Sequence, residues 1–229
     1  MSKTQNLSKH DEIWLGDDDR DLVPEPLTEA LDRIYASGPS ETAMTAAQIK
    51  LDRTLKAEGA MVVYYDYVPA SPIGAFFVAI SEQGVVALSF EESEESFLAW
   101  LQRRVSTGVV REPTKLREVV SQVLEYLEGR RKSFTFAYDL RSLTPFQRDV
   151  LTTVQEVPRG EYLTYGELAR RIGKPGAARA VGQALGSNPI PILIPCHRVL
   201  ASDGSLGGYS GRGGVRTKEA LLRLEGALQ

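Results

Sequence analysis

One segment near the end of the chain, residues 188–200 (NPIPILIPCHRVL), limits the possible folds most strongly. Three prolines alternate in it with aliphatic residues. Proline removes a backbone donor and fixes φ, so the segment cannot form a regular helix or a central strand, yet it is apolar enough to be buried. We therefore expect a stiff, buried, irregular segment that ends in Cys196 and His197.

Cys196 is the only cysteine, so the chain cannot form an internal disulfide. His10 and His197 are the only histidines, too few for a structural zinc site of four Cys or His ligands, and no metal or other cofactor is expected. A thiol that attacks carbon at neutral pH needs a base beside it, because the thiolate is the nucleophile. His197 is the candidate base. Spacing alone does not distinguish a catalytic cysteine from the common alternative, a small cysteine that only fills space in a core.

Residues 1–59 differ from the rest of the chain in composition. Residues 1–60 contain 12 Asp and Glu against 7 Lys and Arg, and apolar residues recur at helical spacing in two stretches separated by Gly38 and Pro39. The pattern indicates an acidic helical extension, either a small helical hairpin or a partly disordered arm. The sequence assigns it no role.

Residues 60–142 are predicted to form a small α+β domain. Three strand-like runs separated by turn residues predict an antiparallel meander, and they cover 61–68, 74–80 and 85–90. Two helical patterns and one more strand-like run follow, at 93–104, 116–127 and 134–138.

Residues 143–229 carry a helix-turn-helix pattern. Two capping boxes, beginning at Thr144 and Thr164, mark helix starts, and a third helix is predicted over about 177–185. A hairpin turn signal at 202–204 would supply a wing. This part contains 11 Lys and Arg against 7 Asp and Glu, and the difference, 11 − 7 = +4, is a basic bias compatible with a phosphate backbone.

The chain contains no run of about 18 apolar residues, and its first 19 residues are polar and acidic. Neither a membrane span nor a secretory signal is expected. We therefore predict a cytoplasmic protein, and we expect it to act as a monomer.

Four short motifs follow one another in the last third of the chain: ARAVG at 178–182, NP at 188–189, PCHRV at 195–199 and GYSG at 208–211. Together they resemble the motifs of the O6-alkylguanine-DNA alkyltransferases. The resemblance is strong over 143–226, fainter over 61–142 and absent before that. It implies an α+β protein with a ribonuclease H-like antiparallel sheet in its N-terminal domain and a winged helix-turn-helix C-terminal domain.

The resemblance also implies a reaction, in which Cys196 accepts the alkyl group of O6-alkylguanine from double-stranded DNA, once per molecule. The family activates its cysteine through a histidine, a water and a glutamate, and the matching residues here are His197 and Glu225. Asn188 would hold the neighbouring turn by hydrogen bonds. A buried glutamate would orient and charge the imidazole, as in other nucleophile-base-acid arrangements.

The O6 atom of guanine lies inside the duplex, so the nucleotide has to be rotated out. The resemblance assigns the vacated place in the base stack to Arg179 and the rotation of the target phosphate to Tyr165. The small residues that would let the second helix lie in the minor groove are Ala177, Ala178, Ala180 and Gly182. The residues that would hold the extruded base are Pro191, Val199, Tyr209 and Ser210.

Two other classes of protein share parts of this pattern. A cysteine hydrolase also combines Cys, His and an acid, but it usually needs an oxyanion hole and a histidine remote in sequence. A non-catalytic DNA-binding module would keep the helix-turn-helix. Cys196 argues against a lesion sensor, and the modest basic charge argues against a sequence-specific regulator. The glycine-rich residues 211–214 leave the tolerance for bulky adducts open.

Overall fold

The computed structural model of the chain describes residues 46–47, 50, 61–91, 93–106, 108–209, 211 and 213–228. All helices and strands named below belong to Lys50–Gln229. The predicted acidic extension, residues 1–59, lies almost entirely outside the described residues. Within the described ranges, no helix is long and apolar enough to cross a membrane.

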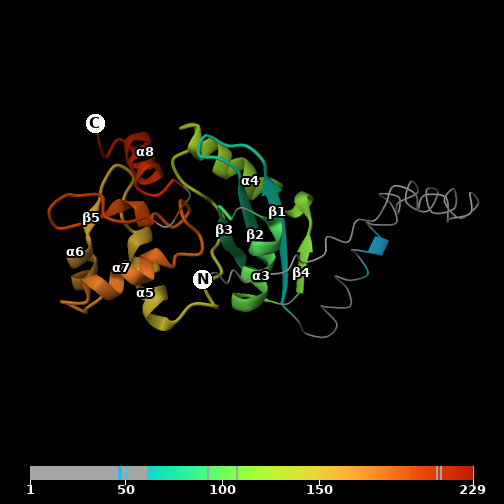
Figure 1. Ribbon diagram of the computed structural model, residues 1–229, viewed down its shortest axis with the longest axis horizontal. Coiled ribbons are helices and arrows are strands. Elements are labelled where there is room, and N and C mark those ends of the chain that lie inside the picture. Colours follow the sequence, from blue (N-terminus) through green and yellow to red (C-terminus); the bar gives the residue numbers. More distant parts are fainter. Residues whose placement is uncertain are drawn as a thin grey trace, which may run out of the picture. The chain divides into compact units, whose positions relative to one another are not determined.

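A four-stranded sheet forms the first half of this region (Figure 1). Its strands are β1 (Val62–Val68), β2 (Phe76–Ser81), β3 (Gly84–Ser89) and β4 (Gly108–Arg111). The first three form the predicted antiparallel meander, and the sheet order is β3-β2-β1-β4. The prediction of a wholly antiparallel sheet is incomplete, because β4 pairs parallel to β1. The run that forms β4 has only four residues, too few for a clear periodic pattern.

Two helices cover the two faces of the sheet. The helix α3 (Glu94–Arg104) packs Phe97 and Leu101 into a cluster with Val63 and Tyr65 of β1. On the opposite face, α4 (Pro113–Leu127) packs against the alternate residues of β1, Val62 and Tyr64. Successive side chains of a strand point to opposite faces, so burial on both sides explains why β1 begins with a continuous run of buried side chains, Val62 to Tyr65. Both predicted helices are confirmed, and α4 begins at Pro113, before the predicted start.

The predicted strand at 134–138 is wrong. These residues run along the free edge of β3 and make a single bridge there, between Val85 and Tyr138. The backbone N–H of Val85 donates to the Ala137 carbonyl at 2.9 Å. Gly84 permits this approach, because its φ is +138° and a Cβ built on it would lie 2.3 Å from the same carbonyl oxygen. The segment therefore protects the sheet edge without extending the sheet.

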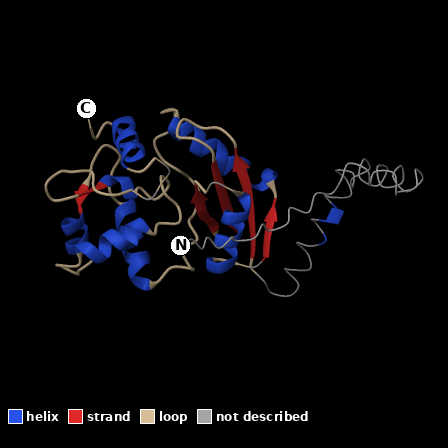
Figure 2. Ribbon diagram, viewed as in Figure 1, coloured by secondary structure: helices blue, strands red, loops and turns tan. Residues whose placement is uncertain are grey.

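Helices are the main regular elements of the described part of residues 143–228 (Figure 2). Their elements are α5 (Pro145–Gln155), β5 (Leu163–Thr164), α6 (Tyr165–Arg171), α7 (Ala178–Gly186), a 3-10 turn η2 (Cys196–Arg198), β6 (Val199–Leu200) and α8 (Val215–Glu225). Both predicted capping boxes are present, at the starts of α5 and α6. The helices α6 and α7 form the predicted helix-turn-helix, and a turn with Gly173 at φ +70° separates them.

The predicted wing hairpin forms only in part. The turn itself is present, since the Ala201 N–H donates to the Ser205 carbonyl at 3.0 Å and the Gly204 N–H to the Ala201 carbonyl. No strand follows it within 205–209, and the two short strands β5 and β6 pair parallel to each other. The turn residues predicted the chain reversal, but they could not predict whether residues 205–209 would pair as a strand.

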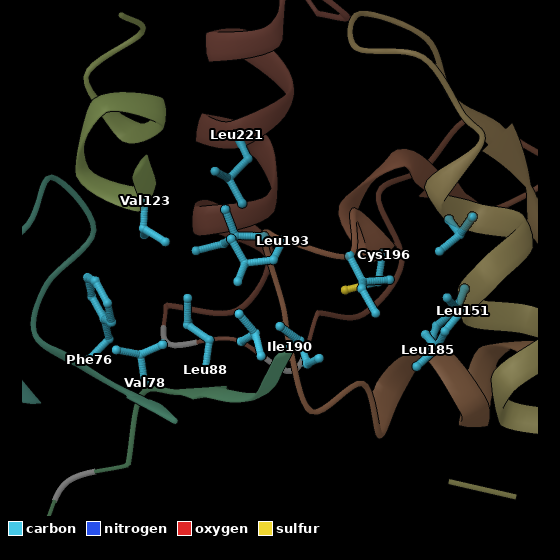
Figure 3. Close-up of a cluster of buried hydrophobic side chains, with 14 of the residues drawn as sticks. Phe76, Val78, Leu88, Val123, Leu151, Leu185, Ile190, Leu193, Cys196 and Leu221 are labelled. Atoms are coloured by element: carbon cyan, nitrogen blue, oxygen red, sulfur yellow. The ribbon is translucent and has the colours of Figure 1, made fainter. Parts of the chain in front are cut away.

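One apolar cluster continues from the α4 side of the sheet into the C-terminal helices (Figure 3). It contains Val123 of α4, Leu151 of α5, Leu185 of α7, Leu221 of α8 and Cys196. The two halves of Lys50–Gln229 therefore share a core. Cys196 is part of that core and, as shown below, also faces a cavity.

The close approach at Gly84 gives a direct test of the sheet edge. Replacement Gly84→Ala should lower the free energy of unfolding by more than about 1 kcal/mol, because the new Cβ meets a backbone carbonyl. Gly166→Ala is the matched control, since a Cβ there has no neighbour within 4 Å in the described structure and the residue lies inside α6. It should raise stability by about 0.5–1 kcal/mol. Urea unfolding measures both, and equal effects of the two substitutions would contradict the described edge.

Candidate active site

A hydrogen-bonded turn holds the segment before Cys196. The Asn188 Nδ2 donates to the Ile194 carbonyl at 3.0 Å, and its Oδ1 accepts from the Ile190 N–H at 3.0 Å. The Ile194 N–H in turn donates to the Ile190 carbonyl at 2.9 Å. Ile192, at the apex, has φ +74°, the single positive φ outside glycine among the described residues. A β-branched residue in this conformation is strained, so the surrounding contacts have to impose the turn.

Residues of the sheet half also bind the segment 188–195 by hydrogen bonds. The Leu88 N–H of β3 donates to the Pro189 carbonyl at 2.9 Å. The hydroxyl of Tyr138 donates to the Leu193 carbonyl at 3.1 Å. These bonds satisfy carbonyl groups that the prolines prevent from joining a regular ladder. The predicted stiff, buried and irregular segment is thus present, and the sheet edge helps to position it.

Cys196 begins the turn η2 and is 6% exposed. Figure 3 shows its side chain among the apolar residues of the shared core. It also lines a cavity of about 280 Å³, whose other lining residues are Tyr165, Gly182, Leu185, Gly186, Gly208 and Tyr209. The cysteine is therefore buried but not sealed off from ligands.

His197 and Glu225 form a buried pair. The His197 Nε2 lies 2.6 Å from the Glu225 Oε1, and the two residues are 0% and 5% exposed. Burial lowers the pKa of His197, and it outweighs the nearby carboxylate, which acts in the opposite direction. The imidazole is therefore neutral at pH 7. Because Nε2 faces a carboxylate, the proton sits there, and Nδ1, buried and without a described hydrogen-bond partner, keeps its lone pair.

Two residues not predicted from the sequence hold the same carboxylate. The Arg198 Nε donates to Glu225 Oε2 at 2.7 Å and its Nη2 donates to Oε1 at 3.1 Å. The hydroxyl of Tyr126, on α4, also donates to Oε1. Burial would raise the pKa of Glu225, but hydrogen bonds from His197 and Arg198 outweigh it and hold the pKa at about 2. Glu225 is thus an anion at neutral pH. Arg198 belonged to a motif that the sequence analysis singled out, whereas nothing near Tyr126 in the sequence points to the site.

The thiol of Cys196 is not a preformed thiolate. Burial raises its pKa, and this effect exceeds the opposing influence of Asn188, the Lys218 charge and two backbone N–H groups. The cysteine therefore needs a base to remove its proton at the moment of reaction. The neutral imidazole that follows it in η2 has the protonation state for that task.

Lys218 of α8 is a third residue that the sequence analysis did not predict. It is 1% exposed, and its Nζ donates to the Val199 carbonyl at 2.6 Å. The same Nζ lies 5.9 Å from the ring centroid of Tyr165. Burial lowers its pKa to about 8, so it is still mostly protonated at pH 7. It therefore places a positive charge beside the cavity and occupies one lone pair of the Val199 oxygen.

The residues predicted to contact DNA lie on the helix-turn-helix. Arg179, in the first turn of α7, is exposed, and Ala178 and Ala180 beside it are partly exposed. Tyr165, the first residue of α6, lines the cavity together with Gly182 of α7. A Cβ on Gly182 would lie 3.7 Å from the Tyr165 ring, which shows how closely this part of the second helix approaches the tyrosine.

The residues predicted to hold the base are only partly brought together. Tyr209 lines the Cys196 cavity, and its hydroxyl is buried with no described partner. Val199 is buried directly after η2. Pro191 instead lines a different cavity of about 320 Å³, together with Asn188 and Gly211. Ser210 lies outside the described residues.

Both halves of this region are similar to domains of known proteins. The 6-O-methylguanine DNA methyltransferase DNA-binding domain matches residues 145–227, and the ribonuclease-like domain of the same proteins matches residues 63–140. A methylated-DNA–protein-cysteine methyltransferase of Shigella flexneri is 40% identical over 162 residues, which cover 69% of this chain and 94% of that protein. This chain belongs to the methylated-DNA–protein-cysteine methyltransferase family.

Two other members of the family show a comparable similarity to this chain. The inducible enzyme of Bacillus subtilis is 38% identical over 152 residues, which cover 66% of this chain and 83% of that protein. The crystal structure of Mycobacterium tuberculosis OGT in complex with DNA superimposes with a TM-score of 0.61 at 38% identity, and the match covers 72% of this chain and 93% of that one. The predicted family and the predicted α+β fold class are therefore confirmed.

The buried carboxylate predicts a pH dependence of stability. The pKa of Glu225 is lower in the folded protein, about 2, than its ordinary value of 4.5. Its contribution is therefore complete above pH 4.5 and is lost as the pH falls toward 2, by about 3 kcal/mol in total. Glu225→Gln should lose this contribution at pH 7 and leave Arg198 without its buried anion, a combined cost of about 3–5 kcal/mol.

Urea unfolding between pH 7 and pH 3 measures this effect. Glu219→Gln is the control, because Glu219 lies on the same helix but pairs with Arg223 at the surface, at 2.7 Å. It should change the free energy of unfolding by less than about 1 kcal/mol. If Glu225→Gln were no more destabilising at pH 7 than Glu219→Gln, the described anion site would be wrong.

Proposed function

We propose that this protein repairs O6-alkylguanine in double-stranded DNA by moving the alkyl group to the sulfur of Cys196, once per molecule. The observation that carries the proposal is the cavity at Cys196, together with the buried pair formed by the adjacent residue His197 and Glu225 of α8. A thioether is stable to water, and the described site has no second thiol that could regenerate the first. The protein is therefore consumed by its reaction.

In the proposed reaction the Cys196 proton passes to His197 Nδ1 through a bridging water, and Glu225 stabilises the imidazolium that forms. The sulfur attacks the alkyl carbon, a carbon–sulfur bond forms, and the bond from carbon to O6 breaks. The electron pair of that bond passes to the guanine, which takes up a proton and leaves as the unmodified base. Ser210, assigned by family resemblance, would donate toward O6.

The DNA side of the proposal assigns a task to five residues of the helix-turn-helix. The small residues Ala178, Ala180 and Gly182 let α7 lie in the minor groove, and Arg179 enters the base stack in place of the rotated guanine. Tyr165 presses on the target phosphate. The base then rests against Tyr209 in the cavity, and the Val199 carbonyl accepts from its exocyclic amine with the lone pair that Lys218 leaves available.

Pro191 needs a further condition in this proposal. It lines a neighbouring cavity, so the two cavities have to join before Pro191 can contact the extruded base.

We also propose the organisation of the chain. Residues 60–142 and 143–229 act as an N-terminal and a C-terminal domain, with residues 1–59 as an acidic extension. The protein works as a monomer, since the cavity and the proton relay are built from one chain. A cytoplasmic location suits a reaction that needs a reduced thiol and access to DNA.

The transfer itself is tested by intact mass. Incubation with a duplex that contains O6-methylguanine should add one methyl group, about 14 Da, to Cys196, and Cys196→Ala should gain nothing. The yield should stop at one methyl group per protein. Continued turnover of excess substrate would identify a hydrolase instead.

Base rotation is tested separately with Arg179→Ala. Unstacking a base costs a few kcal/mol, so loss of the inserted side chain should slow transfer from duplex DNA at least about tenfold. Transfer from single-stranded DNA should change much less, because no stacked partner has to be replaced. Arg117→Ala, an exposed arginine on α4, is the charge-matched control and should retain the wild-type rate on both substrates. Equal slowing on single and double strands would argue against insertion.

A further inference from the structure

We propose that Tyr126 is a positioning residue for alkyl transfer, and that through it the ribonuclease-like half of the protein holds the proton relay in its working geometry. The inference rests on the proposed function, because it concerns the same His197–Glu225 pair. Tyr126 comes from α4 and lies 99 residues before Glu225 in the chain. It is not among the residues that line the cavity at Cys196, and its hydroxyl donates to Glu225, so we infer that it acts on transfer through this carboxylate.

The hydroxyl of Tyr126 has a fixed target. It donates to Glu225 Oε1, and the Arg198 Nη2 lies 3.4 Å from the same hydroxyl oxygen. Burial, reinforced by the Glu225 charge, raises the pKa of Tyr126 to about 12, so the hydroxyl stays a donor at every pH at which the protein would work.

The ring of Tyr126 is held as firmly as its hydroxyl. The residue is 1% exposed, and the Phe134 ring packs against it with 4.8 Å between centroids. The Arg159 guanidinium lies 6.0 Å from the ring centroid. A side chain packed in this way loses little additional entropy when it makes its hydrogen bond, so the bond can orient its acceptor.

The two oxygens of Glu225 have different surroundings. Oε2 accepts from the Arg198 Nε, whereas Oε1 accepts from Arg198, His197 and Tyr126. Arg198 alone would bind both carboxylate oxygens with its forked guanidinium. The direction from which the carboxylate faces the imidazole of His197 could then still change. The tyrosine adds a donor from a different direction and fixes Oε1 opposite the His197 Nε2.

This geometry decides which nitrogen of the histidine is available as the base. While Oε1 faces Nε2, the ring proton stays on Nε2 and the Nδ1 lone pair can accept the thiol proton. A carboxylate that turns away lets the proton move to Nδ1, and that tautomer cannot act as the base. Loss of the tyrosine hydroxyl should therefore act on the rate of transfer through the histidine tautomer.

The test compares Tyr126→Phe with the wild-type protein in single-turnover transfer from methylated duplex DNA. We expect the rate to fall about tenfold, the usual consequence of losing one hydrogen bond to a charged group, with DNA affinity unchanged. Tyr65→Phe is the matched control, because Tyr65 is a buried tyrosine of the same half whose hydroxyl also donates to a glutamate, Glu94, at 3.0 Å. It should transfer at the wild-type rate.

Histidine NMR supplies a readout that a purely structural role would not move. The chain has two histidines, so the imidazole nitrogens of His197 can be assigned by replacing His10. Tyr126→Phe should shift the His197 signals toward a mixture of tautomers, and Tyr65→Phe should leave them unchanged. In a Glu225→Gln background, Tyr126→Phe should cause no further loss of rate.

The outcomes separate the two hypotheses. If the wild-type protein transfers no methyl group, the proposed function fails. If it does transfer, and Tyr126→Phe has the wild-type rate and unchanged His197 signals, the positioning role fails while the function stands. Should Tyr126→Phe not fold, Phe134→Leu loosens the same ring and keeps the hydroxyl. It should lower the rate by a smaller factor and shift the His197 signals, and unchanged signals there would overturn the inference.

Discussion

The negative charge of Glu225 sits in the interior of the protein, where an isolated carboxylate would be strongly unfavourable. Its stability depends on donors from two separate parts of the chain: His197 and Arg198 in η2, and Tyr126 in α4. Because Glu225 is the last residue of α8, these bonds tie the C-terminal helix, the turn that carries the cysteine and the sheet-covering helix to one point. A displacement of any of them would leave a buried charge without partners. The arrangement of the rest of the site follows from this restraint.

Burial also determines the protonation state of the Cys196 thiol. An apolar wall on one side and a cavity on the other leave the sulfur protonated at rest, since burial raises its pKa. A protonated thiol is a weak nucleophile, so the resting cysteine is protected from small electrophiles in solution. In the proposed reaction, the neutral imidazole beside it takes the proton and becomes charged only at the moment of transfer. The strained turn at Ile192, tied by the Asn188 side chain, fixes the backbone that leads into these two adjacent residues.

Local signals in the sequence predicted the features that depend on neighbouring residues. The capping boxes at Thr144 and Thr164 place hydroxyl and carboxamide or carboxylate groups within one helical turn, so their geometry is nearly independent of the rest of the fold. Predictions that needed a remote partner were less accurate. The run at 134–138 has the composition of a strand but meets β3 at one residue only, and β4 is too short to show a period. The wing hairpin was predicted only at its turn for the same reason, since strand pairing depends on remote residues.

By itself the sequence determined the family, the α+β class, the helix-turn-helix and the identity of Cys196, His197, Asn188 and Glu225 as candidates. Each of these is carried by a motif of a few adjacent residues, or by a resemblance that spans most of residues 61–226. Tertiary structure alone decided which groups surround the carboxylate. Tyr126, Arg198 and Lys218 reach the site because burying a charged or polar group requires partners wherever the packed chain supplies them, and sequence separation has no bearing on that requirement. It also decided that Pro191 and Cys196 line different cavities, because the path of a short loop depends on the packing around it.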